Sequence, residues 1–160
     1  MEFKIVDKPS FKLIGKARSF NSATSYSEIP AFWQEFFSCG DNVHVCGTFG
    51  VCIENQLDNT TFQYLIADCY DQNREYPDEF EVYEILENSW AIFPCVGPLP
   101  KSLQCVNTAI FNDWIPNCNE YSLAGGYNIE YYSNPNDYTK GTEDNDYYCE
   151  IWIPVVKNRA

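Results

Sequence analysis

Residues 29–37 read Ile-Pro-Ala-Phe-Trp-Gln-Glu-Phe-Phe. Their apolar side chains recur at i, i+3, i+4, i+7 and i+8, which is the spacing of one face of an α-helix. Pro30 suits the first turn of such a helix, and Gly40 provides a stop after it. The stretch therefore predicts an amphipathic helix whose buried face is aromatic.

Segments with strand composition lie on both sides of this helix. Residues 3–17 combine β-forming side chains before and after Pro9, which predicts one opening strand broken by a turn or a bulge. Residues 49–54 and 62–69 predict two more strands, and the polar run 55–60 between them has the composition of a hairpin turn. The first half is therefore expected to be β, α, β, β.

The same order of elements restarts in the second half of the chain. Strands are predicted over residues 80–85 and 90–96. A second amphipathic helix follows, because apolar side chains step by three and four residues, at Leu99, Leu103, Val106, Ile110 and Trp114. Strands over residues 127–132 and 147–155 finish the chain, and the polar segment 133–146 between them is expected to be a long hairpin loop, able to act as a lid.

This duplicated order predicts an α+β fold. Two β-α-β-β units, over residues of about 1–70 and 80–157, can bury their apolar faces by joining their strands into one antiparallel sheet with two helices on one face. We therefore expect a single domain with pseudo-twofold symmetry. Grooves between helices are recurrent ligand sites, so a ligand groove is predicted between these two.

Charge and composition restrict the possible partners. The chain has 160 residues, with 10 Lys and Arg against 23 Asp and Glu, for a formal net charge of −13. Such a charge repels phosphate backbones and anionic lipids, so we expect neither direct nucleic-acid binding nor membrane binding. The first residues lack the pattern of a secretory signal, which predicts a cytoplasmic protein.

The cysteines and the nucleotide motifs point to no cofactor. The eight cysteines form no Cys-x-x-Cys pair, and His44 is the single histidine. We therefore expect thiols rather than a metal site. The phosphate-binding glycine motifs and the hydrolase nucleophile motif do not occur in the sequence, so no cofactor is predicted.

The last predicted strand carries the candidate chemistry. Residues 147–155 read Tyr-Tyr-Cys-Glu-Ile-Trp-Ile-Pro-Val, and alternation places Tyr148, Glu150 and Trp152 on one face. Alternation alone leaves open whether this face meets water or a ligand groove. In a groove, a carboxylate between aromatic rings can pair with a ligand cation or act as a general base.

Other aromatic residues are candidate walls for such a groove. Trp33 and Trp114 lie on the two predicted helices, where they can either pack in the core or line the ligand site. Trp90 begins a strand and is expected to be a packing residue. Glu130 and Tyr131 lie on a neighbouring strand, and alternation admits one of the two to the groove.

Five segments carry a family resemblance. They are residues 3–9, 29–36, 80–85, 90–100 and 149–155. In their order and spacing they resemble the GyrI-like small-molecule-binding family, whose fold is also the effector-binding domain of AraC-type regulators. The resemblance spans nearly the whole chain and identifies it as a stand-alone single-domain member.

The resemblance implies a pocket between the two helices for hydrophobic compounds that are often cationic or electrophilic. Glu150 matches the pocket acid of the family motif Glu-Ile-Trp-Ile-Pro, which favours the groove for its face of the strand. Some single-domain relatives hydrolyse strained cyclopropane-containing genotoxins with a pocket glutamate, and others sequester ligands or inhibit a topoisomerase. This sequence departs from a common family pattern at Asn107 and Ala109, where the second helix often carries aromatic residues.

Three functions are therefore expected as alternatives. The first is a binding protein for drug-like compounds, with Glu150 as the polar anchor and aromatic walls at Trp152, Tyr148, Trp33 and Trp114. The second is a hydrolase in which Glu150 promotes attack of water on an electrophilic ring. The third is an acidic protein that interacts with gyrase, or with a separate regulator, through its charge.

Overall fold

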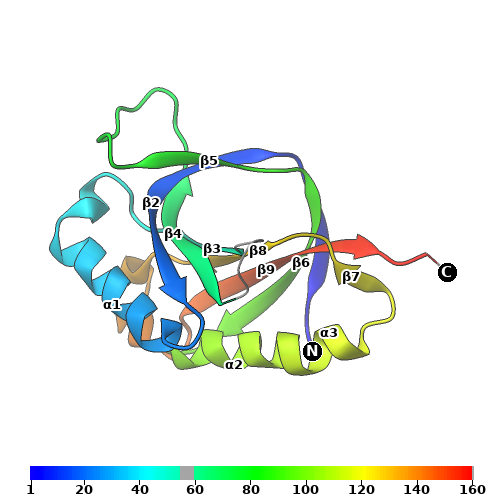
Figure 1. The fold of residues 1–160 in the computed structure, drawn as a ribbon. Coiled ribbons are helices and arrows are strands. Elements are labelled where there is room, and N and C mark those ends of the chain that lie inside the picture. Colours follow the sequence, from blue (N-terminus) through cyan, green and yellow to red (C-terminus); the bar gives the residue numbers. More distant parts are fainter. Residues whose placement is uncertain (55–59, 160) are drawn as a thin grey trace. The chain divides into compact units, whose positions relative to one another are not determined.

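The structure is a computed structural model that describes residues 1–54 and 60–159. The chain packs as two compact units, one of Met1–Pro9 with Glu87–Ala160 and the other of Ser10–Leu86. Within each unit the strands are antiparallel and a helix lies against the sheet (Figure 1). The α+β class and the repeated β-α-β-β order are confirmed, as β2-α1-β3-β4 and β6-α2-β8-β9.

The first unit is built on the strand order β1-β6-β9-β8. Its strands are β1 (Lys4–Lys8), β6 (Asn88–Val96), β7 (Tyr121–Leu123), β8 (Tyr127–Tyr132) and β9 (Tyr148–Lys157). Strands β8 and β7 pair with successive parts of β9. The three residues of β7 were not predicted, because so short a run carries little alternation.

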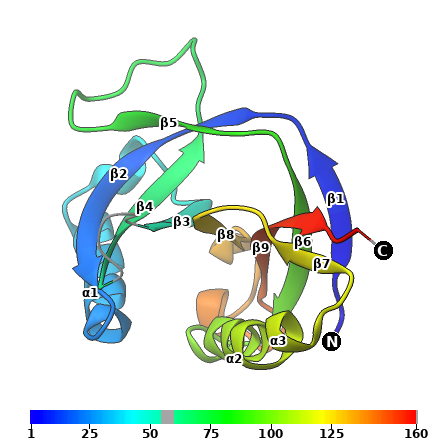
Figure 2. The ribbon, with the colours of Figure 1, turned by 45° about the vertical axis from the view of Figure 1, so that its right-hand side comes forward.

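The helical segment of this unit covers one face of the sheet. It consists of α2 (Lys101–Ala109), a π-helical stretch η2 (Ile110–Trp114) and α3 (Ile115–Asn117), and α2 lies against β6 and β9 (Figure 2). The apolar spacing predicted a helix correctly, although it gave no sign of the π-helical turn. Ile110 is fully buried here against a core that includes Phe93 and Ile151.

The second unit has the strand order β3-β4-β2-β5. Its elements are β2 (Phe11–Asn21), α1 (Ser25–Ser38), η1 (Asp41–Val43), β3 (Phe49–Glu54), β4 (Thr61–Cys69) and β5 (Glu81–Ile85). Phe32 and Phe36 of α1 are buried, as predicted, against strand side chains such as Ile14 and Tyr64.

Two predictions about the first half need correction. The opening segment is not one broken strand, because β1 pairs with β6 whereas β2 pairs with β4 and β5. Pro9 lacks an N–H group and lies between them, so it ends one ladder instead of interrupting it. Helix α1 also begins about one turn earlier than predicted, at Ser25, and Pro30 lies inside it. Gly40, with φ of +81°, follows its end as expected.

The loop before β9 is confirmed as a loop with two short 3₁₀ turns, η3 (Pro135–Asp137) and η4 (Gly141–Glu143). Backbone hydrogen bonds connect it to the segment after β6, from Gly97 N to the Tyr147 carbonyl (3.0 Å) and from Leu99 N to the Thr142 carbonyl (2.9 Å). The predicted hairpin turn between β3 and β4 falls mostly on residues 55–59, outside the described residues.

The helices and the cysteines bear on two further expectations from the sequence. Across residues 1–54 and 60–159, no helix has both the length and the apolar character needed to cross a bilayer. The eight cysteines, all of which lie in the described residues, are thiols rather than disulfides. The ligand groove between the two helices remains a prediction.

Candidate functional site

The candidate site is centred on Glu150 in the middle of β9. The Tyr148 hydroxyl donates a hydrogen bond to Glu150 Oε2 at 2.7 Å, and the Trp152 indole Nε1–H donates to Glu150 Oε1 at 2.9 Å. Both donors come from positions two residues away, so strand alternation alone brings the three side chains to one face. This part of the sequence prediction is confirmed in its geometry.

Each carboxylate oxygen of Glu150 therefore accepts one hydrogen bond from a neutral donor. A carboxylate has about four lone-pair directions, so two are left for other donors or for a cation. Glu150 and Tyr148 are half-buried, and Trp152 is 8% exposed. The two bonds fix the orientation of the carboxylate without neutralising its charge.

The neighbouring strand β8 adds an aromatic side chain beside this face. The register of β8 on β9 places Tyr131 opposite Glu150 and Ile129 opposite Trp152. The Tyr131 and Trp152 rings are stacked, with centroids 6.5 Å apart and 14° between planes. Alternation admitted either Glu130 or Tyr131 to this face, and the register assigns Tyr131.

Strands β6 and β1 supply further contacts of Trp152. Trp90, which is fully buried as expected of a packing residue, meets Trp152 edge to face with ring centroids 6.2 Å apart. The ammonium group of Lys8, at the end of β1, lies 4.6 Å from the centroid of the Trp152 ring. That distance is within the range of a cation–π interaction. The indole of Trp152 thus has a cation over its ring and a carboxylate on its N–H.

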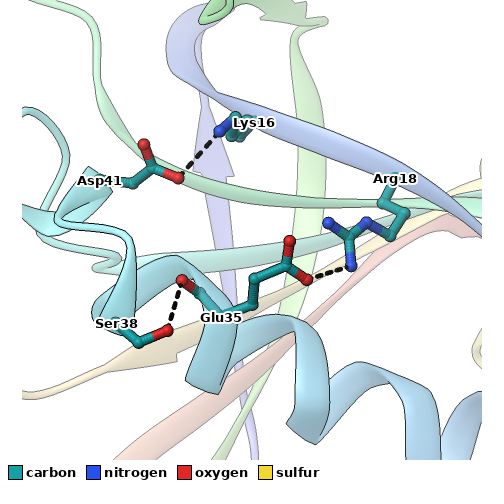
Figure 3. Close-up of polar contacts among 5 residues, drawn as sticks. All are labelled: Lys16, Arg18, Glu35, Ser38 and Asp41. Carbon is teal, nitrogen blue, oxygen red and sulfur yellow. Dashed lines mark hydrogen bonds and ion pairs between the residues drawn. The ribbon is translucent and has the colours of Figure 1, made fainter.

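A second charged group, on β2, α1 and η1 of the other unit, shows a different arrangement (Figure 3). Lys16 pairs with Asp41 at 2.9 Å and Arg18 pairs with Glu35 at 2.8 Å. The hydrogen bond from the Arg18 guanidinium, and then its charge, lower the pKa of Glu35 below its usual range. These charges satisfy one another, so this group is assigned to the stability of the helix–sheet contact.

Those two contacts are the ion pairs found within residues 1–54 and 60–159. Over the same residues, Glu150 has no cationic partner at ion-pair distance. The desolvated Tyr148 hydroxyl, which also bonds to the Glu150 carboxylate, has its pKa raised above the ordinary value. It therefore stays protonated at neutral pH and acts as a donor to Glu150.

The opposite face of the same sheet carries a second glutamate. The Tyr132 hydroxyl donates to Glu130 Oε1 at 2.8 Å, and Glu130 lies opposite Ile151 rather than Glu150. On this face burial raises the pKa of the Cys95 thiol to about 12 and also raises the pKa of Cys149, directly across the strand pair. Both thiols are therefore neutral packing groups.

The two helix tryptophans lie elsewhere. Trp114 packs edge to face against Phe3 and Phe93, with centroids 5.1 Å and 5.0 Å away, in the core beside Ile151 and so on the face that Glu150 does not occupy. Trp33 belongs to the other unit, where its Nε1–H donates to the Tyr64 hydroxyl at 3.0 Å. The structure thus brings Tyr148 and Trp152 to Glu150, and their roles as a ligand site with the two helix residues stay predictions.

Lys8 was missed as a site residue, and no local signal could have found it. Its contact depends on β1 pairing with β6, 80 or more residues away in the chain, and β6 pairing with β9. Together the face offers a charged acceptor, held in place by two neutral donors, with aromatic side chains beside it, and this arrangement suits an aromatic ligand with a positive charge. In the same described part, no three His, Cys, Asp or Glu side chains gather as a metal site.

Comparisons with known proteins bear on this arrangement. The family model of Cass2, the integron-associated effector binding protein, matches residues 4–155. No curated protein matches the sequence. Among solved structures, one is SAV2435 bound to tetraphenylphosphonium, at 21% identity and a TM-score of 0.82, covering 98% of this chain and 94% of that one.

Two further structures share the fold. An integron cassette protein from the mobile metagenome of Vibrio cholerae has 19% identity and a TM-score of 0.69, covering 96% of this chain and 95% of that one. The C-terminal domain of EcmrR has 16% identity and a TM-score of 0.56, covering 99% and 100%. At these identities the structural matches establish the fold.

Proposed function

This chain belongs to the Cass2 family of integron-associated effector binding proteins, in agreement with its GyrI-like resemblance, and we propose that it binds aromatic organic cations with Glu150 as their anchor. The observation that carries the proposal is the Glu150 carboxylate, held by two neutral donors and left without an ion-pair partner in the part of the chain that the structure describes. Tyr148, Trp152 and Tyr131 supply the aromatic surfaces.

The physical case rests on matching charge and shape. A half-buried carboxylate has lost part of its hydration, and a ligand cation replaces part of that lost interaction when it approaches. At an effective dielectric constant of about 20, two unit charges 4 Å apart attract by about 4 kcal/mol, before desolvation is subtracted. Flat aromatic surfaces beside the charge add dispersion and cation–π attraction. The solved relative bound to tetraphenylphosphonium gives a ligand of this chemistry.

Binding of tetraphenylphosphonium tests the proposal. Titration calorimetry should show saturable binding to the wild-type chain, and Glu150→Gln should weaken it by about tenfold, which corresponds to about 1.4 kcal/mol. Triphenylphosphine oxide has similar rings and no net charge, so its weaker binding should be the same in both proteins.

Glu81→Gln is the matched control. Glu81 also accepts a hydrogen bond from a tyrosine two residues away, Tyr83, at 2.8 Å, but it is exposed on β5. Its substitution should leave tetraphenylphosphonium binding unchanged. Equal affinity of the wild-type chain and a folded Glu150→Gln variant would show that the anchor is elsewhere. The hydrolytic and gyrase-directed alternatives remain predictions, which this binding experiment does not test.

A further inference from the structure

Lys8 is a second charged group on the face that carries Glu150. In the register of β1 on β6, Lys8 is opposite Asn88 and Val6 is opposite Trp90. Residues two apart share a face, so Lys8 lies on the face of Trp90, which is also the face of Trp152. The contact of the Lys8 ammonium with the Trp152 ring, at 4.6 Å from the centroid, agrees with this assignment.

The contacts of Lys8 leave most of its binding capacity unused. An ammonium group has three N–H donors, and across the described ranges 1–54 and 60–159 Lys8 has a contact with the Trp152 ring but no hydrogen-bond acceptor or ion-pair partner. The side chain is half-buried, so part of its hydration has been lost. The indole ring replaces that hydration only in part, through its negative face.

Lys8 and Glu150 are close to the same indole but do not pair with each other. The Trp152 ring has the ammonium over its face, and its Nε1–H is bonded to the Glu150 carboxylate at 2.9 Å. The two charges are therefore farther apart than the ion-pair limit of about 4 Å. Because both contact one ring, they are also within about 10 Å of each other. Two opposite charges, each with hydrogen-bonding positions that no described residue fills, thus contact the same indole group.

We propose that Lys8 makes this site select aromatic zwitterions, meaning compounds that carry a positive nitrogen and a carboxylate on one aromatic framework. This inference rests on the proposed function, since it assigns the ligand cation to Glu150. The ligand carboxylate goes to the Lys8 ammonium, and the framework packs against Tyr131, which is stacked on the largely buried Trp152 ring. A compound that carries only a cation is repelled by Lys8, whereas the carboxylate of a zwitterion is attracted to it.

Rhodamine B and its ethyl ester are the probes that test this idea. Rhodamine B has a cationic xanthene and a free carboxylate, whereas in the ester the carboxylate is blocked and the cation remains. Fluorescence anisotropy at low salt should show that the wild-type chain binds rhodamine B about threefold to tenfold more tightly than the ester. The ratio should fall towards one as salt is added, because salt screens the half-exposed Lys8 charge.

Lys8→Met should abolish the preference while keeping most of the apolar length of the side chain. The ester should bind this variant more tightly than it binds the wild type, and rhodamine B less tightly. Lys8→Arg keeps the charge and the contact with the ring, so it should keep the preference. Lys12→Met, at an exposed position on β2, is the charge-matched control and should leave both affinities unchanged.

The outcomes separate this inference from the proposed function. A preference for rhodamine B that survives in Lys8→Met, or a wild-type chain that binds the ester at least as tightly, overturns the role of Lys8. Unchanged binding of the ester by Glu150→Gln overturns the proposed function instead. Failure of the wild-type chain to bind either dye overturns both. Thermal melting of each variant shows whether it is folded, and Lys8→Arg provides the test if Lys8→Met is not.

Discussion

The Tyr148→Phe substitution tests whether the Glu150 carboxylate is held as the structure shows. It removes the hydroxyl that donates to Glu150 Oε2 at 2.7 Å and leaves the ring in place. Hydrogen bonds to charged groups contribute about 1.5–3 kcal/mol, and both partners here are half-buried, so we expect the low end of that range. The free energy of unfolding should fall by about 1.5 kcal/mol.

A double-mutant cycle isolates this bond from other effects of the substitution. Glu150→Gln keeps the shape and a neutral acceptor, so its coupling with Tyr148→Phe measures the charge-assisted part of the bond, about 1 kcal/mol. Urea unfolding at pH 7, followed by tryptophan fluorescence, gives the four free energies. Tyr83→Phe with Glu81→Gln forms the matched cycle at an exposed carboxylate, where the coupling should be below about 0.5 kcal/mol.

The result that refutes the reasoning is a coupling between Tyr148 and Glu150 no larger than that of the exposed pair. It would mean that the carboxylate is solvated and free to rotate. The orientation on which the proposed anchor depends would then be absent in solution.

Two further predictions concern the sheets. A Cβ atom on Gly15 would lie 2.0 Å from the Ile66 carbonyl oxygen, so Gly15→Ala should lower the free energy of unfolding by about 3 kcal/mol or more. Gly125→Ala, where a Cβ atom would have no atom within 4 Å, should lower it little. Equal losses of free energy for the two variants in urea unfolding would contradict the close contact between the strands. The pKa of Cys95 is raised to about 12 and that of Cys149 is also raised, so both thiols ionise more readily in the unfolded chain. Their contribution to the free energy of unfolding is therefore intact below about pH 9 and is lost as pH rises towards about 12. The loss is about 1.4 kcal/mol per pH unit for each thiol. Cys95→Ala should therefore flatten the fall in stability between pH 9 and 10, and an unchanged slope would show that the thiol is hydrated.

The sequence predicted the parts of the site that depend on local geometry. Tyr148, Glu150 and Trp152 are two residues apart, so the period of a strand places them together whatever the rest of the fold does. The same rule left one of Glu130 and Tyr131 for this face, and the register was needed to choose. Local periodicity determines which side chains of one strand share a face, but only the register between strands determines which side chains of two strands lie on the same face of the sheet.

Lys8 illustrates the limit of that reasoning. Residues 3–17 form two strands that pair with different partners, and the sequence around Pro9 gives no indication of which partner each strand takes. The π-helical turn before Trp114 is a similar case, since its apolar spacing fits an ordinary helix. In both places, tertiary packing decides what local propensity leaves open.

The overall charge and Lys8 have separable effects on ligand choice. A net charge of −13 attracts any cation to the surface, but its field fades within a Debye length, about 8 Å at physiological salt. That attraction raises encounter rates without distinguishing one organic cation from another. Discrimination has to come from charges at contact distance, and on this face those are Glu150, at the indole N–H of Trp152, and Lys8, over its ring. Added salt should therefore slow association of the cationic ester, which the net charge attracts, and should also reduce the preference for rhodamine B, because Lys8 is partly exposed and its charge is screened.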